Sequence, residues 1–125
     1  MEEKKASAFI DRFSGQRVAV IGDLMLDRYI WGKANRISQE APVPVVKVER
    51  TTCEPGGAAN VMRNLATLGA RPIPFGVIGM EEAGDALHAL LEKITDSMHG
   101  VVRDGTRRTT QKTRVLAASQ QVVRI

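Results

Sequence analysis

The sequence predicts a doubly wound α/β fold built on a mostly parallel sheet. One observation is an alternation of patterns between residues 18 and 115, which run strand, helix, strand, helix, strand. Such alternation is typical of parallel sheets that are covered by helices. A second observation is the continuous apolar run at residues 18–21, which Gly22 closes. A run of this kind fits a central parallel strand that is buried on both faces.

The first third of the chain is predicted to hold a helix, the central strand and a ribbon. Residues 3–13 place three apolar side chains on one side of a helix, and a Ser-Gly pair ends it. After the strand at 18–21, residues 28–50 contain two prolines and alternating valines. These features favour edge strands or a ribbon over the centre of a buried sheet.

Two helices and a strand are predicted in the middle of the chain. The first helix follows Gly56-Gly57 and ends at Gly69, because apolar residues recur on one face between these points. Residues 71–79 alternate as a strand does. A second helix begins at about Glu81, with acidic residues at the positive end of its dipole.

The last part of the chain carries strand-like patterns at residues 101–102, 108–115 and 121–125. The final run is apolar and has no polar tail, and an exposed strand of this kind invites mispairing. We therefore expect these 125 residues to be the N-terminal piece of a longer protein.

Composition excludes several classes of function. No run of about 18 apolar residues exists and no secretory signal is recognisable, so we expect a cytoplasmic protein without a membrane partner. Cys53 is the only cysteine, so an internal disulfide is ruled out. We expect Cys53 to be a packed thiol. Two histidines and one cysteine make a poor ligand set, so no metal site is predicted. The net charge of +4 is modest, and no nucleic-acid partner is expected.

Two acidic residues follow the first strand. Open α/β sheets bind ligands beyond the carboxyl ends of their strands, where Asp23 and Asp27 lie. A carboxylate there accepts hydrogen bonds from the hydroxyls of a polyol. We interpret Asp23 as a capping or solvated loop residue, and we predict that Asp27 contacts a ligand.

The stretch Gly56-Gly57 precedes a helix and is followed by Asn60. Glycines let main-chain N–H groups approach a ligand closely, and the first N–H groups of a helix lack partners. An amide both donates and accepts hydrogen bonds, as recognition of hydroxyls requires. A tight turn with a helix cap remains the alternative interpretation of this stretch.

Basic residues gather at 103–114. Lys112 and Arg114 lie two residues apart, so on a strand they share a face with Thr110 and offer an anion or phosphate surface. A solvated basic ribbon is the alternative, and it is the better interpretation of Arg107 and Arg108 beside a turn. Neither a P-loop nor a G-x-G-x-x-G motif is present, which argues against a dinucleotide-binding fold.

Three motifs together resemble one known family. They are GD-x-x-x-D after the first strand, PGGAANV opening a helix, and VIG-x-x-x-x-G opening another. This combination resembles the ribokinase-like (PfkB-type) carbohydrate kinases, from about Val18 to the last residue. The longer strings GDLMLDRYIWGKANRISQEAPVPVV and TTQKTRV resemble the branch that phosphorylates D-glycero-D-manno-heptose 7-phosphate.

The resemblance implies a fold, a reaction and a site. Enzymes of that branch transfer the γ-phosphate of ATP to O1 of the heptose 7-phosphate, in ADP-heptose synthesis for lipopolysaccharide cores. Residues 28–50 and 108–125 would form a small β lid, through which subunits pair as a homodimer. By the same resemblance the sugar hydroxyls would be held by Asp27, Gly56, Gly57 and Asn60, and the 7-phosphate by Lys112 and Arg114.

The resemblance also implies what these residues lack. The catalytic base of the family is an Asp in a G-A-G-D-type motif, and it belongs to a C-terminal half together with the anion hole and the nucleotide pocket. We therefore assign no catalytic residue here, and expect ATP and Mg²⁺ to be bound mainly by that half. The 125 residues alone are predicted to be inactive, and either poorly stable or self-associating.

Three alternatives remain open at this point. The chain could belong to a kinase of another sugar, such as fructose 6-phosphate, since GG-A-A-N is one residue shorter than the GG-x-x-x-N of many relatives. It could be a non-catalytic module that recognises a sugar phosphate. It could also be a basic nucleic-acid adaptor that uses the 103–114 cluster, in which case binding would weaken steeply with salt.

Overall fold

Helices and strands alternate along the chain much as the sequence predicts. The computed structural model describes the backbone of residues 2–125 and the side chains of residues 5–125. The elements are, in chain order, α1 (Glu2–Asp11), β1 (Arg17–Ile21), β2 (Leu24–Ile37), β3 (Pro44–Gly57), α2 (Ala58–Thr67), β4 (Arg71–Ile78), α3 (Glu82–Glu92), β5 (Val101–Arg103), β6 (Thr110–Ala117) and β7 (Gln120–Arg124).

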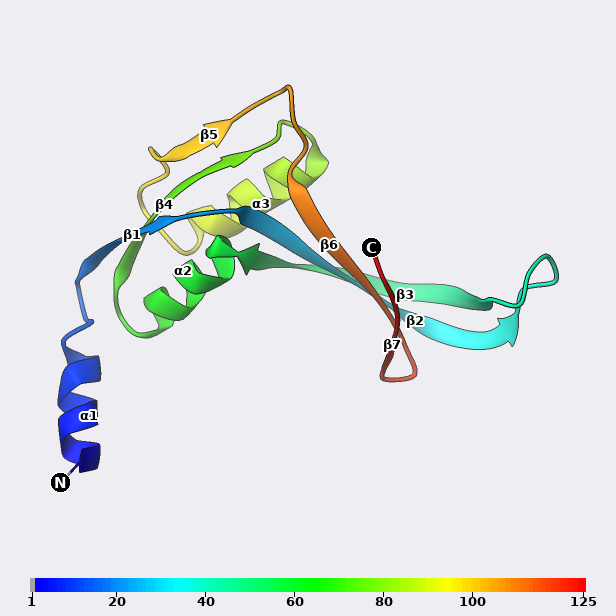
Figure 1. Ribbon diagram of the computed structural model, residues 1–125, viewed down its shortest axis with the longest axis horizontal. Coiled ribbons are helices and arrows are strands. Elements are labelled where there is room, and N and C mark those ends of the chain that lie inside the picture. The colour runs from blue at the N-terminus through cyan, green and yellow to red at the C-terminus, as the bar shows by residue number, and fades with distance from the viewer. Residues whose placement is uncertain (1) are drawn as a thin grey trace.

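The first sheet is parallel and has the strand order β1-β4-β5. Helices α2 and α3 lie along it (Figure 1), as the alternation of strand and helix requires. Apolar side chains from the strands and both helices form one core, whose buried members are Val20, Leu24, Leu26, Ala59, Met62, Ile78, Ala83, Leu87 and Leu91. The predicted α/β class is therefore confirmed. The predicted central place of the strand at residues 18–21 is wrong: β1 pairs only with β4 within the described residues, so it is an edge strand in which Val20 is buried and Ile21 is 80% exposed.

A second sheet of four strands has the order β3-β2-β6-β7. Strand β2 pairs antiparallel with β3 on one side and parallel with β6 on the other. These strands extend away from the helices as a long ribbon (Figure 1). The sheet is therefore mixed, and most of residues 28–50 and 108–125 belong to it.

Strand β2 begins earlier than the sequence analysis expects. The expected ribbon starts at residue 28, whereas the strand starts at Leu24, so Asp27 lies within a strand instead of in a loop. The reason is the alternation of side chains along β2. Leu24 and Leu26 are buried in the core, with exposed fractions of 2% and 0%, while Asp27 points to the opposite face of the ribbon.

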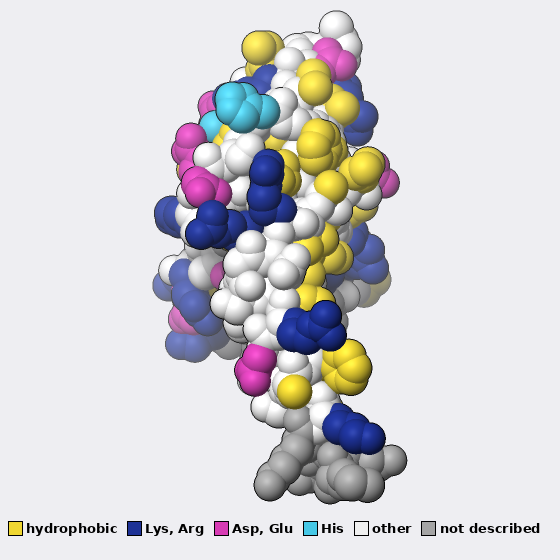
Figure 2. Space-filling model, turned by 90° about the vertical axis from the view of Figure 1, so that its left-hand side faces the viewer, with side chains coloured by type: hydrophobic (Ala, Val, Ile, Leu, Met, Phe, Trp, Pro, Cys, Tyr) yellow, Lys and Arg dark blue, Asp and Glu magenta, His cyan; other side chains and the backbone are white. Residues whose placement is uncertain are grey.

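Helix α1 stands apart from both sheets (Figure 1). The helix ends at Asp11, so Phe13, which was predicted to share its apolar side, lies in the turn that follows. Phe9 is 65% exposed and Ile10 is 49% exposed. Figure 2, which views this end of the molecule, shows hydrophobic side chains gathered in a band along one side of it. Among the helices of residues 2–125, none combines the length and apolar character that a membrane crossing needs.

Candidate functional site

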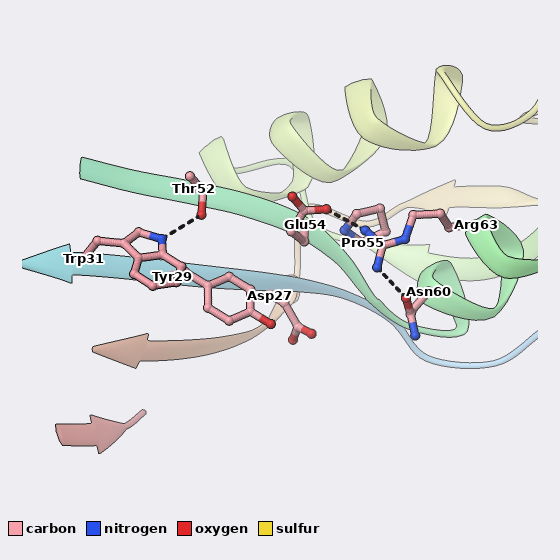
Figure 3. Close-up of a pocket in the computed structure, with 8 residues that line it drawn as sticks. All are labelled: Asp27, Tyr29, Trp31, Thr52, Glu54, Pro55, Asn60 and Arg63. Carbon is pink, nitrogen blue, oxygen red and sulfur yellow. Dashed lines mark hydrogen bonds and ion pairs between the residues drawn. The ribbon is translucent and has the colours of Figure 1, made fainter. Parts of the chain in front are cut away.

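A pocket of about 400 Å³ lies where the β2–β3 ribbon meets the start of α2 (Figure 3). Two residues singled out from the sequence, Asp27 and Asn60, face it from different elements. The pocket is lined by Asp27, Tyr29, Trp31, Thr52, Glu54, Pro55, Asn60 and Arg63. The lining is rich in hydrogen-bonding groups and includes two aromatic rings, a combination that suits a polyol with a partly apolar ring.

The register of the ribbon explains which side chains meet in the pocket. Side chains two residues apart on a strand share a face, so Asp27, Tyr29 and Trp31 line one side of β2. Antiparallel pairing places Glu54 opposite Asp27 and Thr52 opposite Tyr29. A one-residue shift would turn all of them to the other face.

Asp27 is the most confined acid in the pocket. Its side chain is 16% exposed, and its Oδ1 atom lies 3.5 Å from Nη1 of Arg114. Within residues 5–125, neither of these two atoms has a hydrogen-bond partner, although both are buried. Buried polar atoms are nearly always hydrogen-bonded, so this ion pair leaves hydrogen-bonding capacity unused on both atoms.

Gly56 makes room for the Asp27 carboxylate. A Cβ atom on residue 56 would lie 2.8 Å from both Cγ and Oδ1 of Asp27. Real Cβ atoms do not approach other atoms so closely, so any larger residue would displace the carboxylate. The glycine is therefore required for the shape of the pocket, and its predicted contact with a ligand remains a prediction.

The backbone conformation at position 57 requires a glycine. Its φ is 57° with ψ −129°, a conformation that residues with a side chain rarely adopt. A Cβ atom at this position would collide with the carbonyl oxygen of Asp23, which accepts a hydrogen bond from the N–H of Ala58 at 2.9 Å. The tight turn therefore accounts for the conformation of Gly57, and Asp23 contributes its main chain to that turn. The predicted contact of Gly57 with a sugar remains a prediction.

The side chain of Asn60 is held by a neighbour that the sequence analysis missed. Its Oδ1 atom accepts a hydrogen bond from Nη2 of Arg63 at 2.8 Å. Nη1 of the same guanidinium donates to Oε2 of Glu54 at 2.6 Å. Figure 3 shows the three side chains in a row that links β3 to α2.

Lys112 and Arg114 lie beside the pocket on β6. The parallel register sets Lys112 next to Asp27 and Arg114 next to Tyr29, so both cations share the face of the acid. The guanidinium of Arg114 lies over the ring of Tyr29, at 5.2 Å from its centroid. The structure thus brings Asp27, Asn60, Lys112 and Arg114 into one region.

The sequence analysis also missed the two aromatic residues that line the pocket, Tyr29 and Trp31. Tyr29 and Trp31 are stacked with their ring centroids 6.1 Å apart. The indole Nε1 of Trp31 donates to Oγ1 of Thr52 at 3.2 Å, and the guanidinium of Arg50 covers the indole ring at 4.5 Å. The available signal in the sequence was the spacing of two residues between Asp27 and Tyr29 and again between Tyr29 and Trp31, which places the three side chains on one face of a strand that begins at Leu24.

Arg107 and Arg108 lie elsewhere, around a separate hollow of about 430 Å³ that shares no lining residue with the pocket at Asp27. Glu81 lines this hollow, and its carboxylate accepts a hydrogen bond at 2.7 Å from the main-chain N–H of Thr109. Main-chain hydrogen bonds from Glu81 itself and from Thr109 lower the pKa of the Glu81 carboxyl below its ordinary value of 4.5.

Cys53 is a partly buried free thiol.

Comparison with known sequences finds close relatives. The chain is 50% identical over 125 residues to the "Bifunctional protein HldE" of Citrifermentans bemidjiense, covering 100% of this chain and 26% of that protein. It is 50% identical over 112 residues to the protein of the same name from a Caulobacter species (strain K31), covering 90% of this chain and 23% of that protein. The chain thus spans about a quarter of the length of these curated relatives.

Comparison with solved structures shows a shared fold. A carbohydrate kinase from Agrobacterium tumefaciens superposes with a TM-score of 0.64 at 22% sequence identity, covering 88% of this chain and 34% of that one. The arrangement of a helix-covered parallel sheet with a second β ribbon is therefore the ribokinase-like fold. A model of the family described as "pfkB family carbohydrate kinase" matches residues 16–125. The chain belongs to the pfkB family of carbohydrate kinases.

Proposed function

We propose that this chain is the sugar-binding part of an ATP-dependent kinase that phosphorylates O1 of D-glycero-D-manno-heptose 7-phosphate. One observation carries the proposal: Asp27 and Asn60, from distant parts of a pfkB-family chain, face one pocket whose shape depends on Gly56. The choice of heptose is supported by the branch that the motifs resemble and by the relatives named HldE.

The chemistry of the pocket suits an alcohol acceptor that already carries a phosphate. The Asp27 carboxylate accepts hydrogen bonds and orients a sugar hydroxyl, and the Asn60 amide completes the contact. Lys112 and Arg114 supply positive charge on the same face, where a 7-phosphate would be neutralised. Phosphoryl transfer depends mainly on positioning and on charge stabilisation, and these residues supply the positioning of the acceptor.

ATP and Mg²⁺ are assigned to the part of the parent protein beyond these residues. Within the described residues, no three His, Cys, Asp or Glu side chains gather in a way that could hold a metal ion. The donor set of the described residues therefore does not fit Mg²⁺. We expect the 125 residues alone to bind sugar phosphate without turning it over.

The ribbon sheet is proposed to act as a lid. Residues 28–50 and 108–125 would cover the bound sugar and exclude water, which otherwise competes as phosphate acceptor. Strands β3 and β7 are the edges of this sheet, and Val48 and Val123 on them are 56% and 46% exposed. Edge strands with exposed apolar residues favour pairing with a second copy, so we propose a homodimer through the lid. We also propose a cytoplasmic location, because a kinase of this kind needs ATP.

Calorimetric titration of the complete protein tests the proposal. We expect selective binding of heptose 7-phosphate over fructose 6-phosphate, and a loss of at least about 100-fold in affinity for Asp27→Asn, because a charged acceptor becomes a neutral amide. Asp23→Asn is the matched control, since Asp23 is exposed and lines no part of this pocket. Preference for fructose 6-phosphate would replace heptose 7-phosphate as the assigned substrate. Unchanged affinity in Asp27→Asn would contradict the assignment of this pocket as the sugar site.

A further inference from the structure

Arg63 makes two hydrogen bonds to two different elements around the pocket. Its Nη2 atom donates to Oδ1 of Asn60, one helical turn earlier on α2, and its Nη1 atom donates to Oε2 of Glu54 on β3. The side chains of Arg63 and Glu54 are 46% and 48% exposed. Ion pairs at this exposure contribute little to folding stability, so the main effect of Arg63 is on the orientation of the side chains that it contacts.

The orientation of the Asn60 amide follows from the chemistry of its partner. An amide side chain has an accepting end and a donating end, which exchange places when the group rotates by half a turn. A guanidinium only donates hydrogen bonds, so it binds the oxygen end and rejects the nitrogen end. Arg63 therefore leaves the donating nitrogen of Asn60 to the pocket, which this side chain lines.

Glu54 supports this arrangement from the other side. It lies opposite Asp27 in the β2–β3 pairing, so two acids face the same pocket from adjacent strands. The bond from Arg63 neutralises Glu54 and holds the guanidinium in reach of Asn60 (Figure 3). Asp27 then remains the pocket acid whose buried oxygen, although it pairs with Arg114, has no hydrogen-bond partner within the described residues.

We propose that Arg63 is a positioning residue, which fixes Asn60 as a hydrogen-bond donor to the sugar. This inference rests on the proposed function. Asp27 and Asn60 then make opposite demands on the sugar. A hydroxyl that contacts Asp27 must donate a hydrogen bond, and a hydroxyl that contacts the nitrogen of Asn60 must accept one. The arrangement selects hydroxyl groups over groups that only donate, such as an ammonium, at the Asn60 position.

A double-mutant cycle on the complete protein tests the inference. Affinity for heptose 7-phosphate is measured by calorimetry for Asn60→Ala, Arg63→Met and the double variant. Arg63→Met is expected to weaken binding about 10-fold, the size typical of a charged hydrogen bond. In the Asn60→Ala background the same substitution is expected to have no further effect, because residues that act through one another are not additive. Arg71→Met is the matched control for the loss of one exposed positive charge.

A spectroscopic measurement separates orientation from charge. The side-chain amide signals of Asn60, identified by their absence in Asn60→Ala, are expected to shift in Arg63→Met without ligand and to stay in place in Arg71→Met. If Arg63→Met fails to fold, as judged by its melting curve, Arg63→Gln serves for both measurements.

The affinities of the single and double variants distinguish the possible roles of Arg63. A loss from Arg63→Met that is equally large in both backgrounds would mean that Arg63 acts on the ligand directly, and it would overturn the inference alone. No loss from Arg63→Met, while Asn60→Ala weakens binding, would overturn it as well. If Asn60→Ala itself leaves affinity unchanged, the proposed sugar site fails and the inference fails with it.

Discussion

The carboxylate of Asp27 occupies the space in which any residue other than glycine at position 56 would carry its Cβ atom. The separation would be 2.8 Å to both Cγ and Oδ1 of the acid. The two residues come from neighbouring strands, with Gly56 paired to Met25 and Asp27 paired to Glu54. The position of the acid and the absence of a side chain at position 56 therefore depend on one another.

Gly56→Ala should therefore move the carboxylate and weaken sugar binding strongly, by about 10-fold or more, because a misplaced acceptor loses its hydrogen bond. Calorimetry with heptose 7-phosphate measures the effect. Gly22→Ala is the control, since a Cβ atom there would meet its nearest neighbour at an ordinary 3.4 Å. Full affinity in Gly56→Ala would show that the carboxylate need not lie where it does.

Gly57→Ala should destabilise the fold, because it forces a side chain into a positive φ and against the Asp23 carbonyl oxygen. Backbone strain of this kind costs about 1–3 kcal/mol, and the collision adds to it. Thermal unfolding measures the change, with Gly22→Ala again as the control. A melting temperature equal to that of the wild type would contradict the structural account of this glycine.

Thr95 joins the end of α3 to β4 in the interior. It is 8% exposed, and its hydroxyl donates to the carbonyl of Pro72 at 2.7 Å and accepts from the N–H of Ser97 at 3.2 Å. Thr95→Val should lower the free energy of unfolding by about 1–3 kcal/mol, because buried polar groups lose their partner. Thr67→Val removes an exposed hydroxyl bond instead and should change stability far less; equal effects in the two variants would refute this assignment.

Glu81 should make the stability of the fold depend on pH. Hydrogen bonds to its carboxylate keep its folded pKa below the ordinary value of 4.5. A group with a lowered folded pKa stabilises the fold above its unfolded pKa, and that contribution disappears as pH falls through the folded pKa. Melting temperatures measured between about pH 3 and pH 6 should fall less steeply for Glu81→Gln than for wild type. Glu40→Gln, at an exposed acid between β2 and β3, is the control for the loss of one carboxylate. A curve for Glu81→Gln that runs parallel to the wild-type curve would contradict the prediction.

The fold was largely predictable because its signals are local. The apolar faces of α2 and α3 are periodic in the sequence, and the core confirms them. The run at residues 18–21 does form a strand, but β1 lies at the edge of its sheet and only Val20 of the run is buried. The division into two sheets was not predictable in the same way. Strand β2 pairs with β3 and also with β6, whose partner residues lie 85 positions further along the chain (Met25 pairs with Thr110), and no local pattern shows such pairing.

The candidate site was predictable only in part, for a related reason. Asp27 and Asn60 were found through motifs, and the structure places both in one pocket. Arg63 and Glu54 were not found, because their roles arise from a contact across the β3–α2 junction. Exposed charged residues on a helix and a strand usually face solvent, so their types alone carry little information.

The central claim is that a carbohydrate binds between Asp27, Asn60 and the main chain at Gly56. A crystal structure of the complete protein with heptose 7-phosphate tests it most directly. We predict one sugar hydroxyl within about 3.2 Å of the Asp27 carboxylate, another contact to the nitrogen of Asn60, and the 7-phosphate near Lys112 or Arg114. A sugar bound elsewhere, with this pocket filled by protein side chains or left to water, would contradict the account.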